Sequence, residues 1–365
     1  MIYFLSFIIV IGLPVFLHEL GHFLAAKSVG IKVEKFYVGF NFFNLGIKKK
    51  YKDTEYGIGL FPMGGYVKVA GILDESLDMN SEKKNYEFRS KNMFQKIWFL
   101  SAGVLMNFLL STIIFSFFVF SDGLPEIVDL PIVNEVTTEL KISDEIVQSP
   151  ASSIGLIKGD KIIAVNNTYV YTWLELSDII HDSPDISINI KWERSNQIFN
   201  SEIKPIRVQQ FIDGEVKDIG ILGISPNYTI RNISLFASII KGFEQTLTVL
   251  YQISSSLKAL FNGSVSMGDF FGPVGLVKMA GETAETGIKP LFFLTAMISV
   301  NLGLINILPI PGLDGGHVFI ALIEGIIRKD LPLKIKYVIQ ITGFILIMSL
   351  FIFVLFNDLN RLIVG

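Results

Sequence analysis

Four long apolar segments divide this chain, and stretches of mixed polarity lie between them. Residues 2–17 contain no charged side chain, and the apolar pattern resumes at residues 23–26. Similar runs occupy residues 97–120, 291–308 and 337–356. A helix of about 20 apolar residues crosses the hydrocarbon core of a bilayer. The pattern therefore predicts four transmembrane helices in a lipid bilayer.

Charge predicts the orientation of these helices. The first basic residue, Lys27, follows the first run, whereas a secretory signal peptide begins with basic residues, so we expect a retained helix. Residues 30–93 contain 11 Lys/Arg and 8 Asp/Glu, while residues 121–230 contain 8 Lys/Arg and 17 Asp/Glu. Because basic loops stay in the cytoplasm, we expect the acidic block and both termini outside it.

Residues 235–261 are apolar enough to be considered as a further span. They also carry Lys241, Glu244 and Lys258. Large apolar residues recur there every three or four positions, a period that predicts an amphipathic helix lying along an interface or against a domain. A fifth spanning helix is the alternative. The recurring residues are Phe236, Ile240, Phe243, Leu247, Leu250, Ile253, Leu257 and Leu260.

Residues 121–230 have the pattern of a folded, water-soluble domain. Short β-rich stretches at 132–136, 161–165, 186–192 and 219–224 alternate with turn residues. Thr172 and Glu175 have the spacing of a capping box, which predicts the start of a helix.

The composition excludes several classes of protein and of binding site. Of 365 residues, 50% are hydrophobic, only 18% are charged, and none is Cys. This composition excludes a disordered chain, a disulfide scaffold and a thiolate metal site. A net charge of −3, with no basic cluster, gives no indication of nucleic-acid binding.

The first apolar run is interrupted by His18-Glu19-Leu20-Gly21-His22, an H-E-x-x-H motif. Positions i and i+4 lie on one face of a helix, so both imidazoles can reach one Zn²⁺, and Glu19 can accept a proton from water activated there. The alternative is a surface turn with two unrelated histidines. It conflicts with the position inside a span, where ionisable groups are costly.

A third ligand is expected, because catalytic zinc usually has three from the protein. Asp314 follows a helix break at Pro309, Pro311 and Gly312. Irregular backbone at membrane depth is tolerated where it lines a cavity. Asp314 is therefore the predicted third ligand, with His317 in reserve. A solvated Asp in a helix-ending turn is the alternative.

Depth in the membrane agrees with this pairing. His18 lies about 25 Å along the first helix, toward the cytoplasmic side. A third span that runs inward brings Asp314 to the same side. A fifth span at 235–261 would place Asp314 on the opposite face.

Together these motifs resemble the site-2 protease family of intramembrane zinc metalloproteases, in its regulator-of-sigma-E protease branch. The likeness covers most of the chain in order. The likeness includes the H-E-x-x-H motif and a second motif, N-x-x-P-x-P-x-L-D-G, which runs from Asn306 through Asp314. It also includes the segments Gly59 to Lys68 and Gly272-Pro-Val-Gly275. The block at residues 121–230 resembles a bacterial PDZ domain through its motif at residues 149–167. We expect one such domain in this chain, where the regulator-of-sigma-E protease itself has two.

The resemblance implies roles for individual residues. His18, His22 and Asp314 would bind Zn²⁺, and Glu19 would be the general base. Asn306 would hold the substrate backbone or the developing oxyanion, with an interhelical hydrogen bond as the alternative. Residues 56–69 would form a re-entrant strand that holds an unwound substrate, with Gly64 and Gly65 allowing close approach. An ordinary cytoplasmic hairpin is the alternative.

We therefore expect a polytopic α-helical membrane protein with four transmembrane helices, an inserted extracytoplasmic β-rich PDZ domain and a cytoplasmic-side re-entrant β-hairpin. The expected segments are 1–29 (first span with H-E-x-x-H), 30–93 (cytoplasmic loop with a membrane-associated hairpin at about 55–70), 94–120 (second span), 121–230 (PDZ domain), 231–288 (amphipathic helix and linker), 289–318 (third span with the Asp314 motif), 319–336 (cytoplasmic loop) and 337–365 (fourth span and tail).

The expected activity is zinc-dependent hydrolysis of peptide bonds within transmembrane helices, in a bacterial inner membrane. The resemblance implies pre-trimmed single-pass substrates, such as anti-sigma factors or signal-peptide remnants. The PDZ domain is expected either to exclude substrates with bulky outer domains or to bind a newly exposed C-terminus, with residues 221–224 as its peptide-binding edge. A non-catalytic, metal-binding membrane PDZ scaffold is the alternative, and a metal transporter is a second one.

Overall fold

The computed structural model describes residues 2–41, 46–72, 84–142, 145–212, 215–263 and 272–364. Parts of the expected loop 30–93, of the domain 121–230 and of the linker 231–288 thus lie outside the described residues. The chain divides into two compact units. The helical unit contains residues 1–118, 235–254 and 265–365, and the β-rich unit contains residues 119–234 and 255–264.

Among the residues that the structure describes, four helices are long and apolar enough to cross a membrane, as the sequence predicted. They cover Ile2–Ser28, Met93–Asp122, Ile288–Ile307 and Lys334–Asn360. The first consists of α1 (Ile2–Phe7), a π-helical stretch (Ile8–Gly12) and α2 (Leu13–Ser28). The others are α3 (Met93–Asp122), α8 (Ile288–Ile307) and the greater part of α10 (Leu333–Val364).

The segment at 235–261 forms one helix, α6 (Leu235–Phe261), which is not among the helices apolar enough to span. Its buried side includes small and polar residues that pack against α3. Thr246 Oγ1 lies 3.1 Å from Thr112 Oγ1 of α3, and a Cβ added at Gly242 would lie 2.5 Å from the backbone nitrogen of Ser116. Such close approach through small residues is typical of helices packed in a membrane.

The predicted apolar stripe of α6 is exposed in its N-terminal half. Phe236 and Phe243 have exposed fractions of 74% and 52%. Further along the helix, Leu250 and Ile253 pack against a core cluster of the helical unit. The position of α6 along an interface stays a prediction.

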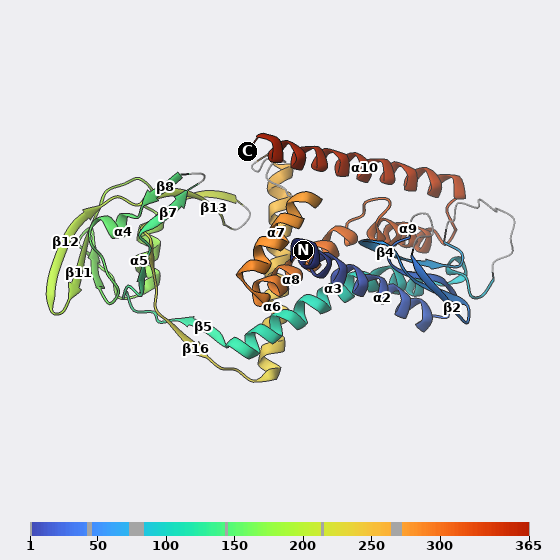
Figure 1. Ribbon diagram of the computed structural model, residues 1–365, viewed down its shortest axis with the longest axis horizontal. Coiled ribbons are helices and arrows are strands. Elements are labelled where there is room, and N and C mark those ends of the chain that lie inside the picture. Colours follow the sequence, from blue (N-terminus) through green and yellow to red (C-terminus); the bar gives the residue numbers. More distant parts are fainter. Residues whose placement is uncertain are drawn as a thin grey trace. The chain divides into compact units, whose positions relative to one another are not determined.

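A four-stranded sheet lies beside α2 in the helical unit (Figure 1). Its strands are β1 (Val33–Phe40), β2 (Ile47–Tyr51), β3 (Thr54–Ile58) and β4 (Phe61–Val69), in the order β2-β3-β1-β4.

The expected two-stranded hairpin at 55–70 is corrected by this order. Strand β1 lies between β3 and β4, parallel to the first and antiparallel to the second. The short connection from Ile58 to Phe61 crosses the end of β1 where its pairing register shifts between Val38 and Phe40. Gly39 adopts a φ of 79° at this shift, a conformation open to glycine at no steric cost. The sequence predicted a strand within residues 56–69, but the order of the strands in the sheet depended on this irregularity in β1.

Tyr37 stabilises the centre of the sheet. Its ring stacks on Tyr66 of β4 with centroids 5.1 Å apart, and its hydroxyl donates to Glu55 Oε1 of β3 at 2.6 Å. Burial, together with the Glu55 carboxylate, raises the pKa of Tyr37 to about 12. The same hydrogen bond lowers the pKa of Glu55. The phenol thus stays protonated and the carboxylate ionised at neutral pH, so this contact ties three strands together.

Two further helices complete the helical unit, α7 (Pro273–Thr286) and α9 (Asp314–Ile327). Helix α9 occupies residues for which the sequence predicted the end of a span and a loop. A short 3₁₀ turn, Phe88–Ser90, precedes α3. Glu324 of α9 joins α3 and α10, because Lys96 and Lys336 lie 3.6 and 2.5 Å from its carboxylate oxygens.

Helix α10 is attached to the unit at a few points. Only 6% of its apolar window is buried, so most of its surface is available to lipid. Near its C-terminal end, the buried Asp358 carboxylate accepts three backbone N–H bonds from the start of α7. The donors are Gly272, Val274 and Gly275, at 2.9, 3.0 and 3.0 Å. A carboxylate at this place satisfies N–H groups that have no partner within the helix.

The β-rich unit has one hydrophobic core. Strands β9 (Lys161–Val165), β10 (Thr168–Tyr169), β11 (Ile188–Arg194) and β12 (Gln197–Ile203) form an antiparallel sheet in the order β10-β9-β11-β12. Helix α5 (Trp173–His181) buries Leu176 in the core together with Ile162 and Ile190. The predicted capping box of Thr172 and Glu175 is confirmed at the start of α5.

Paired strands and one short helix surround this sheet. Strand pairs are β5 (Leu124–Ile127) with β16 (Tyr228–Arg231), β6 (Glu135–Val136) with β15 (Ile224–Ser225), β7 (Glu139–Ile142) with β8 (Glu145–Gln148), and β13 (Ile206–Ile212) with β14 (Glu215–Ile221); the helix is α4 (Pro150–Ser153).

The contacts of Asp358 predict that it attaches α10 to α7. Replacing it by alanine leaves three backbone N–H groups without their acceptor, so we expect Asp358→Ala to lower the free energy of unfolding by about 1–3 kcal/mol. Thermal unfolding in detergent micelles measures this change. Asn360→Ala is the matched control, because Asn360 is exposed on the same helix. Equal unfolding midpoints for the two variants would contradict the attachment.

Candidate metal centre

The two histidines of the H-E-x-x-H motif lie on the buried face of α2, one helical turn apart. His18 and His22 have exposed fractions of 7% and 6%. Their Nε2 atoms are 3.2 Å from each other. Both rings thus turn the same nitrogen toward one point, as the i, i+4 spacing predicted.

Asp314 arrives at this point from the other end of the chain. Helix α8 ends at Ile307, the backbone then turns, and α9 begins at Asp314 itself. Asp314 Oδ2 lies 3.1 Å from Nε2 of His18 and 3.1 Å from Nε2 of His22. The turn is tight, because a Cβ at Gly315 would lie 2.2 Å from the carbonyl oxygen of Leu308. Gly315 therefore lets the chain double back and hold the carboxylate against α2.

These three donor atoms fit a zinc ion. Tetrahedral zinc with ligands at about 2.0–2.1 Å requires donors about 3.3 Å apart. The observed separations are 3.1, 3.1 and 3.2 Å. Two imidazoles and one carboxylate are also a donor set typical of catalytic zinc, which keeps its fourth position open.

Glu19 lies between this cluster and the four-stranded sheet. The backbone N–H of Val67 in β4 donates a hydrogen bond to its carboxylate. Gly65 of the same strand is so close that an added Cβ would lie 3.0 Å from Glu19 Cγ and 2.8 Å from the carbonyl oxygen of Tyr37. The structure thus brings Glu19 and Gly65 together, and the absence of a side chain at Gly65 allows the strand to approach α2.

Comparison with known proteins agrees with this arrangement. The profile of Peptidase family M50 matches residues 6–350. The chain belongs to peptidase family M50. The predicted resemblance to site-2 proteases is thereby confirmed.

Individual relatives of this M50 chain match along nearly its whole length. A candidate zinc metalloprotease of Clostridium perfringens is 31% identical, over 94% of this chain and 95% of the relative. One of Campylobacter jejuni is 32% identical, over 99% and 94%. Zinc metalloprotease RasP of Geobacillus kaustophilus is 29% identical, over 98% and 97%.

Three other predicted site residues lie outside the donor cluster. Asn306 is half-buried in the last turn of α8, and its carboxamide makes no hydrogen bond to another described residue. His317 lies in the first turn of α9 and does not contribute to the cluster of donors found among the described residues. Gly64 precedes Gly65 in β4, with a φ of 143° that other residues rarely adopt.

The sequence analysis missed the contribution of α3. The carbonyl oxygen of Phe99 lies 2.8 Å from His22 Nδ1, and the amide nitrogen of Asn107 lies 3.2 Å from His18 Nδ1. Between them, Gly103 leaves room for both rings. One signal was available, since Asn107 is a carboxamide in the middle of an apolar run, where polar side chains are costly.

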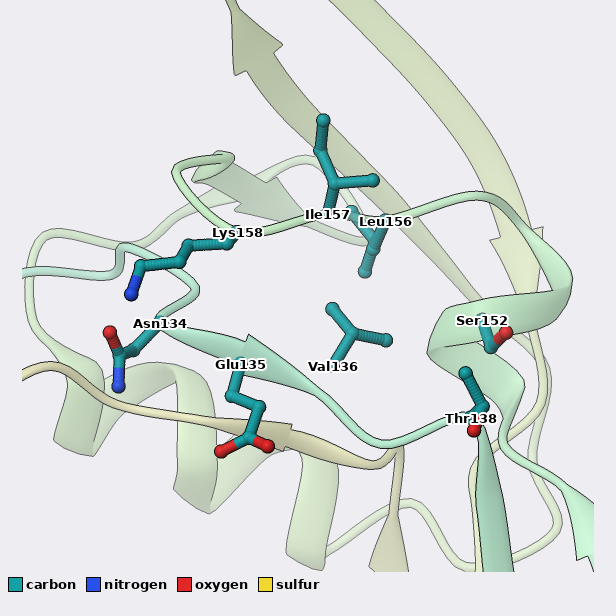
Figure 2. A pocket seen from close by; sticks show the side chains of 8 residues that line it. All are labelled: Asn134, Glu135, Val136, Thr138, Ser152, Leu156, Ile157 and Lys158. Carbon is teal, nitrogen blue, oxygen red and sulfur yellow. The ribbon is translucent and has the colours of Figure 1, made fainter.

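The β-rich unit has an open pocket of about 550 Å³ beside β6 and α4. Figure 2 shows the polar ends of Lys158 and Asn134 at one end, Val136 and Leu156 between, and two hydroxyl side chains at the other.

The predicted peptide edge at 221–224 does not line this pocket. That segment is not one strand, because β14 ends at Ile221 and β15 starts at Ile224. The carbonyl groups of Leu222 and Gly223 accept bonds from Ala151 and Thr137. Part of its backbone is thus already bonded within the domain.

The packing at Gly103 predicts a sensitive position. In Gly103→Ala the new Cβ would lie 2.5 Å from His22 Nε2 and 2.7 Å from His18 Cε1. Overpacking of this kind costs about 1–3 kcal/mol, so we expect a loss of zinc affinity of about tenfold or more. Zinc bound per protein in a chelator competition measures it. Gly12→Ala is the control, since its Cβ would meet nothing closer than 3.7 Å. Equal zinc affinity in the two variants would show that the rings tolerate the methyl group.

Proposed function

We propose that this M50 peptidase is an intramembrane protease that hydrolyses peptide bonds within or beside transmembrane helices. The proposal rests on one observation. Two imidazoles and one carboxylate converge to within 3.2 Å of each other, two of them on a helix that is apolar enough to cross a membrane. Relatives named zinc metalloproteases support zinc as the bound metal.

Each polar residue of the centre has a proposed part in hydrolysis. His18, His22 and Asp314 hold zinc, which supplies Lewis acidity to the scissile carbonyl group and to a water molecule. Glu19 accepts the proton of the attacking water and delivers it to the leaving amine nitrogen. Its carboxylate is adjacent to His18 in the motif and is oriented by the backbone N–H of Val67.

Strand β4 is the proposed docking edge for the substrate. A transmembrane helix has its carbonyl groups hydrogen-bonded, so it must unwind before water attacks. Among the described strands β4 pairs with β1 alone, which leaves its other edge for strand addition. Because Gly65 touches Glu19, a segment paired with β4 would be carried to the general base. Asn306 is proposed to donate its amide to the substrate backbone or the developing oxyanion.

Further proposals concern the membrane, the β-rich unit and the substrates. We propose that the four apolar helices place the centre toward the cytoplasmic side of a bacterial inner membrane, with both termini outside. The β-rich unit is proposed to be a PDZ domain that either excludes bulky substrates or binds a C-terminal peptide. Pre-trimmed single-pass proteins, such as anti-sigma factors and signal-peptide remnants, are the proposed substrates. Membership of a peptidase family argues against the alternative of a non-catalytic scaffold.

The role of Glu19 is tested by cleavage of a synthetic transmembrane helix in proteoliposomes. Glu19→Gln keeps the size of the side chain but removes the proton acceptor. We expect cleavage to fall by at least about 10²-fold while bound zinc is retained, and a chelator to abolish cleavage by the unmodified protein.

Three outcomes separate the alternatives. Equal cleavage by both forms would mean that Glu19 is not the base. If neither the unmodified protein nor Glu19→Gln cleaves a pre-trimmed substrate, although both bind zinc, the scaffold alternative is favoured. Zinc flux across the same liposomes would indicate a transporter.

The docking edge predicts a second effect on cleavage. Gly65→Ala pushes β4 away from Glu19 and Tyr37, so we expect cleavage to fall by at least about tenfold with zinc content unchanged. Ile58→Ala is the matched control, because Ile58 is 64% exposed on β3. A Gly65→Ala variant that cleaves at the control rate would exclude close docking along β4.

A further inference from the structure

One face of α3 packs against the H-E-x-x-H motif of α2. Phe99, Gly103 and Asn107 are spaced four residues apart, so they lie in a row along this helix. Phe99 meets His22, Asn107 meets His18, and Gly103 lies against both rings. The spacing of the row matches the i, i+4 spacing of the two histidines on α2.

The surroundings of His22 show what a metal-binding imidazole needs at this site, which is a hydrogen-bond acceptor for the ring nitrogen that does not bind the metal. Its Nε2 is turned toward Asp314, so the ring proton of the neutral imidazole lies on Nδ1 when Nε2 binds a metal. The carbonyl oxygen of Phe99, 2.8 Å from Nδ1, accepts that proton. A backbone carbonyl thus fixes both the tautomer and the orientation of this ring.

His18 has the same requirement, and no backbone carbonyl group among the described residues meets it. Its Nε2 is also turned toward Asp314, and its Nδ1 faces the carboxamide of Asn107 at 3.2 Å. The amide nitrogen is the nearer end, whereas the amide oxygen has no hydrogen-bond partner among the residues that the structure describes. The two ends of a carboxamide have nearly the same shape, so a half-turn of the group presents the oxygen to Nδ1–H.

Asn107 is held firmly enough to act in this way. The residue is completely buried. Its own carbonyl oxygen accepts hydrogen bonds from Ser111 Oγ at 3.1 Å and from Ser299 Oγ of α8 at 2.9 Å. The backbone beneath the carboxamide is therefore fixed by two helices, and only the end of the side chain can turn.

We propose that Asn107 is a positioning residue for the metal centre. Its amide oxygen accepts the Nδ1–H of His18 and so fixes the tautomer that offers Nε2 to the metal. The inference rests on the proposed function, because it takes His18 as a zinc ligand. It adds that the second span supplies the partner for each histidine, a backbone carbonyl for His22 and a side chain for His18.

Three full-length variants in detergent test this role. Asn107→Leu keeps the volume but removes the acceptor, and Asn107→Asp keeps an acceptor. Ser116→Ala is the control, because it removes a buried polar group of α3 that bonds the carbonyl oxygen of Thr112 and contacts neither Asn107 nor the imidazoles. Zinc affinity is measured by competition with a chromophoric chelator. The visible absorption of the Co²⁺-substituted protein reports the geometry of the ligands.

Loss of a partner of this kind costs about 10- to 100-fold in metal affinity. We expect that loss, with an altered Co²⁺ spectrum, in Asn107→Leu. We expect Asn107→Asp to restore most of the affinity and the spectrum, and Ser116→Ala to keep both. A purely structural role for Asn107 would not give rescue by aspartate.

Other outcomes would overturn the inference. Unchanged affinity and spectrum in Asn107→Leu would show that His18 needs no partner on α3. Equal losses in Asn107→Asp and Ser116→Ala would show that packing alone matters. Absence of zinc binding by the unmodified protein would instead overturn the proposed function, and this inference with it.

Discussion

A polar side chain among apolar helices is stable only when its charge and hydrogen bonds are satisfied by its neighbours. That constraint organises the helical unit. His18, His22 and Asp314 come from two regions nearly 300 residues apart in the chain, yet their donor atoms meet within 3.2 Å. A metal ion at this point would compensate all three groups at once, which explains why so many polar atoms gather in so apolar a unit.

Close approach of backbones makes this meeting achievable. A Cβ at Gly21 of α2 would lie 2.5 Å from the carbonyl oxygen of Ala102 in α3, and Gly103 receives the imidazoles in return. Gly315 allows the break after α8 to fold back at the start of α9. Lipid gives helices no hydrophobic reason to associate with one another, so tight packing through small residues has to supply the stability. The glycines that admit the polar groups are thus also those that hold the helices together.

The sheet and α10 contribute in opposite ways. Strand β4 is tied to α2 through Gly65, Val67 and Glu19, and Tyr37 links three strands of the sheet. These contacts join that side of the unit to the helix that carries the two histidines. Helix α10 is attached near its ends through Glu324 and Asp358 and is little buried between them. Few buried contacts are typical of elements that move at low cost.

The sequence by itself determined the local features. Apolar runs predicted the spanning helices because a helix that crosses the hydrocarbon core needs about 20 predominantly apolar residues. The i, i+4 spacing placed two imidazoles on one face, and the prolines before Asp314 ended α8, since both effects act within a few residues. Tertiary structure decided the rest. Strand order depended on an irregularity at Gly39, and the contact of Asn107 with His18 depended on which face of α3 meets α2. Such contacts join residues far apart in the chain, and local pattern carries no information about which distant partners they meet.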